Sequence, residues 1–200
     1  MAVVGIMGLL AVVGVPALKG LAGSGGRKQA LSQVLGAIEV ARNTAISTGT
    51  NAAVIFPDSS FDQGQAYRYR SMAVVSWFTD SQGKVTNKMV GSWIVLPQGT
   101  AFFPKSLATT NLVLATNVTY RILTSTKTGN FPAIMFQGDG ALAEDPLNTA
   151  SKFPTNGIAF FEGTVSGDTA NKMYPKLTNF ETVRVSRYSG RAQATLAPEP

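Results

Sequence analysis

The chain has 200 residues, of which 44% are hydrophobic and only 14% charged, and its formal net charge is +6. This composition fits one globular domain with or without a short appendage, and it excludes a disordered chain. Because the sequence contains no Cys and no His, it excludes disulfides, thiolate zinc sites, thiol nucleophiles and histidine-based acid–base pairs. A Ser/Lys dyad or a carboxylate pair stays open, but the 11 acidic residues show no obvious pairing, so we expect no enzyme, no cofactor and no metal.

The first eighteen residues, MAVVGIMGLLAVVGVPAL, contain no charged or hydrogen-bonding side chain. As a helix with a rise of ~1.5 Å per residue they would span about 27 Å, just short of the ~30 Å hydrocarbon core of a bilayer. A helix that is apolar on every face is stable in lipid or among similar helices. We therefore predict a membrane or filament-core helix segment over residues 1–26, carried by Met1, Val4, Ile6, Leu9, Leu10, Val13, Pro16 and Leu18.

Two other interpretations of this segment stay open. A cleaved secretory signal would have a basic stretch before the apolar run, whereas here the run begins at Met1. An ordinary signal anchor, oriented by Lys19, Arg27 and Lys28, would leave the rest of the chain in the cytoplasm.

A second, amphipathic helix is predicted over residues 27–50. Pro16 and the glycines at positions 20, 23, 25 and 26 weaken the helix between the two segments. Apolar residues then recur at spacings of three and four until Gly49, which is typical of a helix end. The stripe that we expect to pack on a sheet consists of Leu31, Val34, Leu35 and Ile38.

The remaining residues, 51–200, have the pattern of a β-rich domain. Runs rich in β-branched and aromatic residues predict strands at 52–56, 66–78, 91–96, 118–124, 132–137, 157–162, 181–188 and 191–196. Turns are predicted at 80–83, 97–99 and 138–140, with Ser189-Gly190 as a two-residue hairpin loop. Residues 144–154 and 166–179 lack alternation and are predicted as loops. The expected fold class is α+β, with a long N-terminal helix packed on an antiparallel sheet.

A fully apolar helical half, a proline and an amphipathic half that leads into a β-rich domain resemble the N-terminal region of type IV pilins and type II secretion pseudopilins. The residues that carry the resemblance are MAVVGIMGLLAVVGVPALKG and ALSQVLGAIEVARNTAISTGTNAAVIF, and the second stretch is most similar to the H-type minor pseudopilins. IMFQGDG and VRVSRYSGR fit the same family more loosely. The resemblance implies a pilin-like fold, leader cleavage and N-terminal methylation.

The sequence departs from that family at its start. Members carry a glutamate four residues after the mature N-terminus, whereas the first acidic residue here is Glu39. Aligning Pro16 with the family's proline places that glutamate two residues upstream of Met1. We therefore expect the leader and the first mature residues to lie upstream of the sequence given.

Two groups of basic residues are candidate nucleic-acid contacts. In the run Tyr67-Arg68-Tyr69-Arg70, strand alternation would send the tyrosines and the arginines to opposite faces, which favours a half-buried strand. Near the C-terminus Arg184, Arg187 and Arg191 lie beside Tyr188, without an acid between Glu181 and Glu199. These three arginines could contact DNA, as in the DNA-binding minor pilins that the family includes, or they could form a solvated sheet edge.

One candidate cation site is suggested by Gly138-Asp139-Gly140 with Glu144 and Asp145, because calcium prefers several oxygen ligands. The spacing matches no defined loop motif, so a plain turn is favoured.

The resemblance implies a structural subunit held in the bacterial inner membrane, with its β domain in the periplasm. Its partners would be other pilin or pseudopilin subunits, bound through the N-terminal helix in a type II secretion pseudopilus or a type IV pilus, and no small-molecule substrate is expected. Two alternatives stay open: a DNA-binding minor pilin for DNA uptake, and an exported membrane-anchored enzyme or sugar-binding module.

Overall fold

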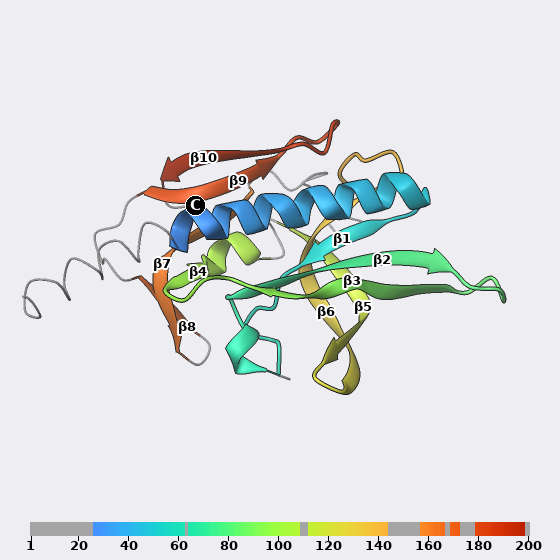
Figure 1. Cartoon of the computed structure of the whole chain (residues 1–200), viewed down its shortest axis with the longest axis horizontal. Coiled ribbons are helices and arrows are strands. Elements are labelled where there is room, and N and C mark those ends of the chain that lie inside the picture. Colours follow the sequence, from blue (N-terminus) through green and yellow to red (C-terminus); the bar gives the residue numbers. More distant parts are fainter. Residues whose placement is uncertain are drawn as a thin grey trace, which may run out of the picture.

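A computed structural model describes residues 26–62, 64–108, 112–143, 157–166, 169–172 and 179–198. Within these ranges the chain forms one helix, over residues 26–48, and two antiparallel sheets (Figure 1). The predicted α+β class, with an N-terminal helix packed on antiparallel sheet, is confirmed.

The first sheet has the strand order β3-β2-β1-β6-β5. Its members in chain order are β1 (Ala52–Ile55), β2 (Ser71–Thr79), β3 (Val85–Val95), β5 (Val113–Ile122) and β6 (Ser125–Phe136). The second sheet has the order β10-β9-β7-β4, and β8 pairs with β7 beside it. Its strands are β4 (Thr100–Phe102), β7 (Ile158–Ser166), β8 (Thr169–Lys172), β9 (Asn179–Val185) and β10 (Ala192–Pro198). Two 3-10 turns, η1 (Gln65–Tyr67) and η2 (Pro104–Leu107), precede β2 and β5.

The helix lies between the two sheets, with the β9–β10 hairpin on one side and β1 and β2 on the other (Figure 1). Its fully buried face is rich in alanine, which lets the backbones of both sheets approach closely, and consists of Ala30, Val34, Ala37, Ile38, Ala41 and Ala45. Of the predicted stripe, Val34 and Ile38 are buried, while Leu31 and Leu35 are partly buried and pack against the same core cluster. That cluster extends to Phe136 in the first sheet and to Phe160 and Val183 in the second.

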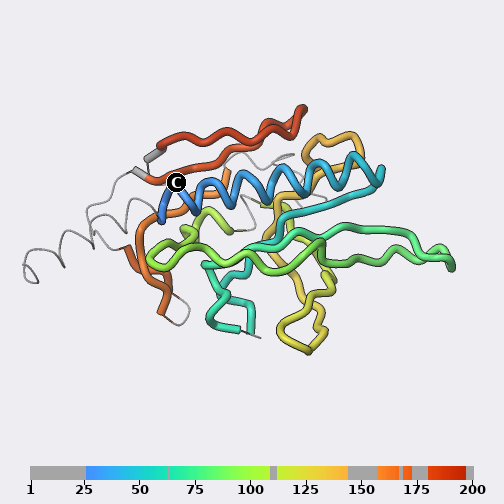
Figure 2. Tube along the Cα trace, in the orientation of Figure 1, coloured from blue at the N-terminus to red at the C-terminus, as the bar shows by residue number. Residues whose placement is uncertain are grey.

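The first sheet curls around a second core that faces away from the helix. Five aromatic rings with centroids 5.2–6.3 Å from their neighbours fill this core: Phe61, Tyr67, Trp93, Tyr120 and Phe131. The curl brings the two edge strands, β3 and β5, together along a line that we call the seam. Side chains of β3, rather than its backbone, bridge the seam to β5, as the hydrogen bonds of Asn87, Met89 and Trp93 show. Figure 2 traces the β2–β3 hairpin past the C-terminal end of the helix.

The prediction of a strand over residues 66–78 is wrong for its first five residues. Residues 65–67 form η1, residues 68–70 form a turn, and β2 begins at Ser71. Arg68 is buried and its Nε donates to the carbonyl oxygen of Phe61 at 2.5 Å, while Tyr69 adopts a φ of 55° and its hydroxyl accepts from the Ser59 amide. The buried hydrogen bond of Arg68 determines the backbone conformation here more than the alternation of the sequence does. The tyrosines and arginines therefore do not lie on opposite faces of a strand.

Other strand boundaries also differ from the prediction. β4 and β8 are short strands without a sequence signal, and β3 and β6 begin several residues earlier than expected. The predicted loop over 166–179 contains β8 and the start of β9, whereas the predicted loop over 144–154 lies outside the described residues. The β9–β10 connection is longer than two residues, because the amide of Ser186 donates to the carbonyl oxygen of Arg191 at 2.9 Å and thereby closes a four-residue loop.

The three other predicted turns are confirmed. The Asp80 carboxylate caps its turn by accepting from the amides of Gln82 and Lys84, both at 2.9 Å. Turns are also present at 97–99 and 138–140, and Gly49 ends the helix with a φ of 65° that favours glycine.

Candidate assembly surfaces

The predicted membrane or filament-core segment lies outside the described residues. Met1, Val4, Ile6, Leu9, Leu10, Val13, Pro16 and Leu18 therefore keep the status of a prediction from sequence. In the part of the chain that the structure describes, no helix is long and apolar enough to span a membrane.

The described helix is fixed at its N-terminal end by both sheets. Gly26 lies close to Pro97: a Cβ atom added to Gly26 would be 3.7 Å from the Pro97 Cβ, which is ordinary van der Waals contact. The Arg27 guanidinium forms an ion pair with the Glu181 carboxylate of β9, at 3.4 Å. The chain thus enters the domain between the 97–99 turn and β9.

One solvent-exposed row of helix residues is uncharged over about five turns, with the exposed Lys28 and the half-exposed Glu39 beside it. Six exposed residues recur at spacings of three and four, and we call them the exposed helix stripe: Gln29, Ser32, Gly36, Val40, Asn43 and Ser47. The exposed faces of helices usually carry charged residues, and Val40 is an apolar side chain with 47% exposure. The stripe residues themselves are neutral and mostly small, so burying them against another helix desolvates no charge of their own.

The C-terminal half of the helix holds the loop of the β9–β10 hairpin. Nε of Arg42 donates to the carbonyl oxygen of Ser189 at 2.8 Å, and the Leu142 amide donates to the carbonyl oxygen of Arg187 at 3.0 Å. Gly190 has a φ of 63°, and a Cβ at this position would collide with the carbonyl oxygen of Gly140. Sequence reasoning missed Arg42, because nothing in its local pattern indicates a partner 147 residues away.

The three predicted anion-contact arginines meet at this hairpin. Arg184 near the end of β9, Arg187 in the loop and Arg191 just before β10 are all exposed. The Arg187 guanidinium lies 5.1 Å from the centroid of the Tyr188 ring, and Tyr188 is 81% exposed. The arrangement presents an aromatic face together with three positive charges.

The predicted calcium turn has another role in the described chain. The Asp139 carboxylate accepts a hydrogen bond from the Ala141 amide at 2.9 Å, which is the geometry of an ordinary Asx turn. Glu144 and Asp145 lie outside the described residues, and elsewhere in the described ranges no three potential metal ligands come together.

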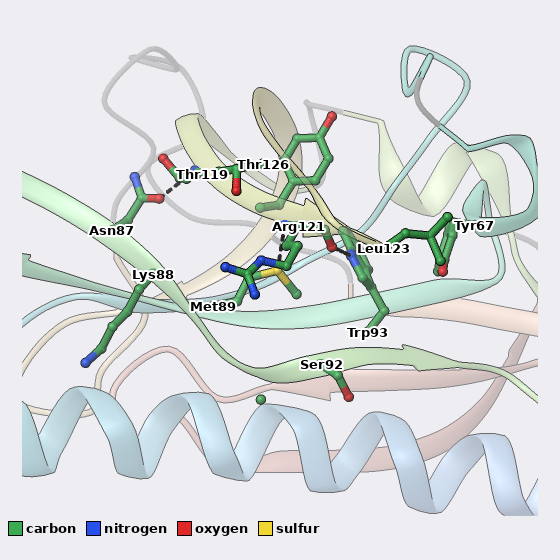
Figure 3. Close-up of a pocket in the computed structure, with 12 residues that line it drawn as sticks. Tyr67, Asn87, Lys88, Met89, Ser92, Trp93, Thr119, Arg121, Leu123 and Thr126 are labelled. Atoms are coloured by element: carbon green, nitrogen blue, oxygen red, sulfur yellow. Dashed lines mark hydrogen bonds between the residues drawn. The ribbon is translucent and has the colours of Figure 1, made fainter.

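A cavity of about 560 Å³ lies over the seam between β3 and β5 (Figure 3). Lys88 and Ser92 both line it, but no hydrogen bond links them, so the described residues form no Ser/Lys dyad there. Burial, and secondly the negative charge of Asp62, raise the pKa of the Tyr120 phenol in its lining. Nothing in the sequence pattern predicted this cavity, because it forms where two edge strands meet.

Comparison with known families identifies one family that matches most of the described helix and strands. A family model described as Type II transport protein GspH matches residues 30–160, which is more than half of the chain. No curated protein and no solved structure matches the chain significantly. The matched residues include most of the helix, the whole first sheet and the start of β7. The chain therefore belongs to the GspH family of type II transport proteins.

Proposed function

We propose that this chain is a minor pseudopilin, a structural subunit that residues 1–18 anchor in the inner membrane and that assembles into the pseudopilus of a type II secretion system. The periplasmic part would be the domain described above. The observation that carries the assembly proposal is the exposed helix stripe, whose six residues from Gln29 to Ser47 are all uncharged. The role is mechanical, so no residue is assigned to catalysis.

The physical basis is the small free-energy difference between two environments. A segment with no polar side chain is stable in lipid and also among similar helices, so it can leave the membrane for a filament at low net cost. The exposed helix stripe would extend that helix–helix contact beyond the membrane, because it offers small and neutral side chains.

Cross-linking tests the assembly surface directly, because the chain has no cysteine of its own. Gly36→Cys and Val40→Cys, each in the full chain in membranes, should give linked oligomers with a short bis-maleimide. The matched control is Lys84→Cys, at the exposed tip of the β2–β3 hairpin. Equal yields at all three positions, or no oligomers at the two stripe positions, would contradict the proposal.

Membrane fractionation tests the anchor. Leu10→Lys places a charge in the middle of the apolar segment at a cost of about 2.5–3.5 kcal/mol, so it should shift the chain from the membrane to the soluble fraction. Leu10→Ala is the control and should stay in the membrane. A full chain that is a water-soluble monomer without detergent, combined with a misfolded fragment lacking residues 1–26, would refute the anchor.

A second function, DNA binding, is favoured by the stacked Arg187–Tyr188 pair at the exposed hairpin. Aromatic faces stack on bases while arginines contact phosphates, and both groups lie at the same hairpin end. Three arginines are few, so the binding would be weak and strongly dependent on salt.

A gel shift over a range of salt concentrations tests this second function. Replacing Arg184, Arg187 and Arg191 together with Ala should abolish the shift. The control removes the same charge elsewhere, at the exposed residues Lys28, Lys84 and Lys127. A shift that survives the arginine replacements, or one that both triple variants weaken equally, would exclude the hairpin as the DNA site.

A further inference from the structure

The outer edge of the second sheet is a feature that the proposed function leaves unexplained. β10 is the first strand in the order β10-β9-β7-β4, and no described strand pairs with its other side. Figure 1 shows β10, drawn in red, at the border of the molecule beyond β9. A free edge of this kind is a template for pairing with another chain.

Three residues of β10 direct their backbone groups at the free edge. The Ser186 amide donates to the carbonyl oxygen of Arg191 at 2.9 Å, so these two residues form a hydrogen-bonded pair of the β9–β10 ladder. Such pairs alternate along an antiparallel ladder, so the backbone groups of Gln193 and Thr195 also face β9. The residues whose amides and carbonyl oxygens face away from β9 are Ala192, Ala194 and Leu196.

β10 lacks the features that usually prevent strand addition. It contains no charged residue over Ala192–Pro198, and its register with β9 is continuous, without a bulge. Pro198 has no amide hydrogen, but it is the last residue of the strand. The free edge therefore ends at Pro198 and is uninterrupted before it.

The side chains on the helix side of this edge are apolar and uncovered. Ala194 lies opposite Val183 of β9, which belongs to the core that packs on the helix. Leu196 lies opposite Glu181, whose carboxylate pairs with Arg27 of the helix. Ala194 and Leu196 thus lie on the same face as the helix, yet Leu196 is 67% exposed. An apolar residue of an added strand would cover it.

The charged residues at the start of β10 are arginines. Arg191 immediately precedes the strand, and Arg184 lies opposite Gln193 on the face away from the helix. Both arginines are exposed, and neither forms an ion pair with a described residue.

The carboxylates on the neighbouring elements do not balance these arginines. Glu181 lies at the other end of the β9–β10 hairpin and pairs with Arg27, and Glu39 pairs with Arg42 at 3.8 Å. Asp139 caps its own turn, and Glu199 lies outside the described residues. Charge complementarity therefore favours an acidic residue in a strand that adds beside Arg191.

A second copy of this chain fits the edge less well than a different protein does. If two copies of β10 paired antiparallel about Ala194, Leu196 would lie opposite Ala192, which offers only a methyl group to cover it. A second β10 would also bring no charged strand residue to Arg191. The edge thus calls for a larger apolar side chain and an acid, which β10 itself does not supply.

We propose that β10 accepts an extended segment of a partner protein in which apolar and acidic residues alternate. Its backbone would bond to Ala192, Ala194 and Leu196. An apolar side chain would lie against Leu196 on the helix side, and an acidic side chain would lie near Arg191 on the other face. Recognition by strand addition takes its affinity from the main chain and its specificity from alternate side chains. This inference rests on the free edge of β10 and does not depend on filament assembly.

Ala194→Pro separates the free edge from the fold of the hairpin. The proline removes an amide that faces away from β9, and its ring occupies the place of the added strand, while the amides that bond to β9 are kept. The full chain in mild detergent is titrated by calorimetry with an acetylated and amidated peptide of alternating valine and glutamate. Ala194→Pro should weaken binding at least about tenfold, whereas the matched control Ala194→Thr, which keeps the amide, should change it less than about twofold.

A second pair of variants tests the charge. Arg191→Ala should weaken binding of the same peptide by about two- to fivefold, as expected for an exposed ion pair. Lys84→Ala removes the same charge at the exposed tip of the β2–β3 hairpin and should leave binding unchanged. Equal effects of the two variants would overturn the placement of the acidic residue beside Arg191.

Hydrogen exchange of the unmodified chain is a measurement that does not depend on how any variant folds. The peptide should slow exchange of the amides of Ala192, Ala194 and Leu196 and leave the turn at 80–83 unchanged. The proposal is overturned if the peptide does not bind, if these three amides gain no protection, or if a folded Ala194→Pro variant binds as tightly as the unmodified chain.

Competing ligands and the oligomeric state separate the other occupants of this edge. A valine–lysine peptide that binds equally well, or full displacement of the acidic peptide by free glutamate or by a short DNA duplex, would overturn the proposal. Light scattering of the chain without peptide tests for a second copy. A dimer that Ala194→Pro dissociates and Ala194→Thr does not would assign the edge to self-association instead.

Discussion

Gly190→Ala is the substitution that tests most directly how the hairpin loop is held against the helix. Gly190 has a φ of 63°, so an alanine there costs about 1–2 kcal/mol for the left-handed backbone alone. The new Cβ would also collide with the carbonyl oxygen of Gly140 and come within 3.0 Å of Cδ of Arg42. Overpacking of this kind adds about 1–3 kcal/mol, so the free energy of unfolding should fall by about 2–5 kcal/mol.

The matched control for this experiment is Gly83→Ala. Gly83 has a φ of 78°, but a Cβ there meets nothing within 4 Å, so only the backbone cost of about 1–2 kcal/mol applies. Chemical denaturation of both variants, followed by circular dichroism, gives the difference between them. A Gly190→Ala variant that is no less stable than Gly83→Ala would show that the loop shifts freely and that the contacts through Arg42 and Gly140 do not hold it.

Three further substitutions have defined outcomes. Ile38→Ala removes a fully buried helix side chain and should lower the free energy of unfolding by about 2–5 kcal/mol, whereas Val40→Ala on the exposed stripe should change it by less than about 0.5 kcal/mol. The pKa of Tyr120 is raised above 10.0 by burial and by Asp62, so the folded chain keeps a proton that the unfolded chain loses, and stability falls as the pH rises above about 10. Tyr120→Phe should reduce that alkaline loss in pH-dependent denaturation, while the exposed control Tyr188→Phe should not. Leu123→Asn, which suits a φ of 53°, should raise the thermal midpoint and the free energy of unfolding by about 0.5–1 kcal/mol, and a decrease would refute the assigned strain.

The helix and its stop were predictable because their signals are local. Apolar spacing of three and four, followed by Gly49, predicts a helix that ends near residue 49, and the resemblance to H-type pseudopilins is confirmed by the family match. The exposed helix stripe follows from the same spacing, but only the structure shows which of the polar positions form the exposed row.

The seam and the hairpin anchor could not be predicted, because both depend on side chains that bind backbone groups far away in sequence. The Asn87 side chain bonds the backbone groups of Asn117 and Thr119, which lie 30 and 32 positions later in the sequence, and Arg42 bonds the carbonyl oxygen of Ser189. An asparagine or an arginine in a strand or helix looks like a solvated residue until its partner is placed. The same holds for Arg68, whose burial replaced a predicted strand with a turn.

The position of the helix has a mechanical consequence for the proposed function. A helix lying on one sheet could slide or detach under load, but this helix packs against two sheets with its buried face. It is also tied to β9 by the Arg27–Glu181 pair and to the hairpin loop by Arg42. Its alanine-rich buried face fits closely between both layers, so an axial shift by one residue would push larger side chains into the contacts now made by Ala37 and Ala41. Force applied to the N-terminal segment during assembly would therefore move the whole domain together rather than extract the helix from it.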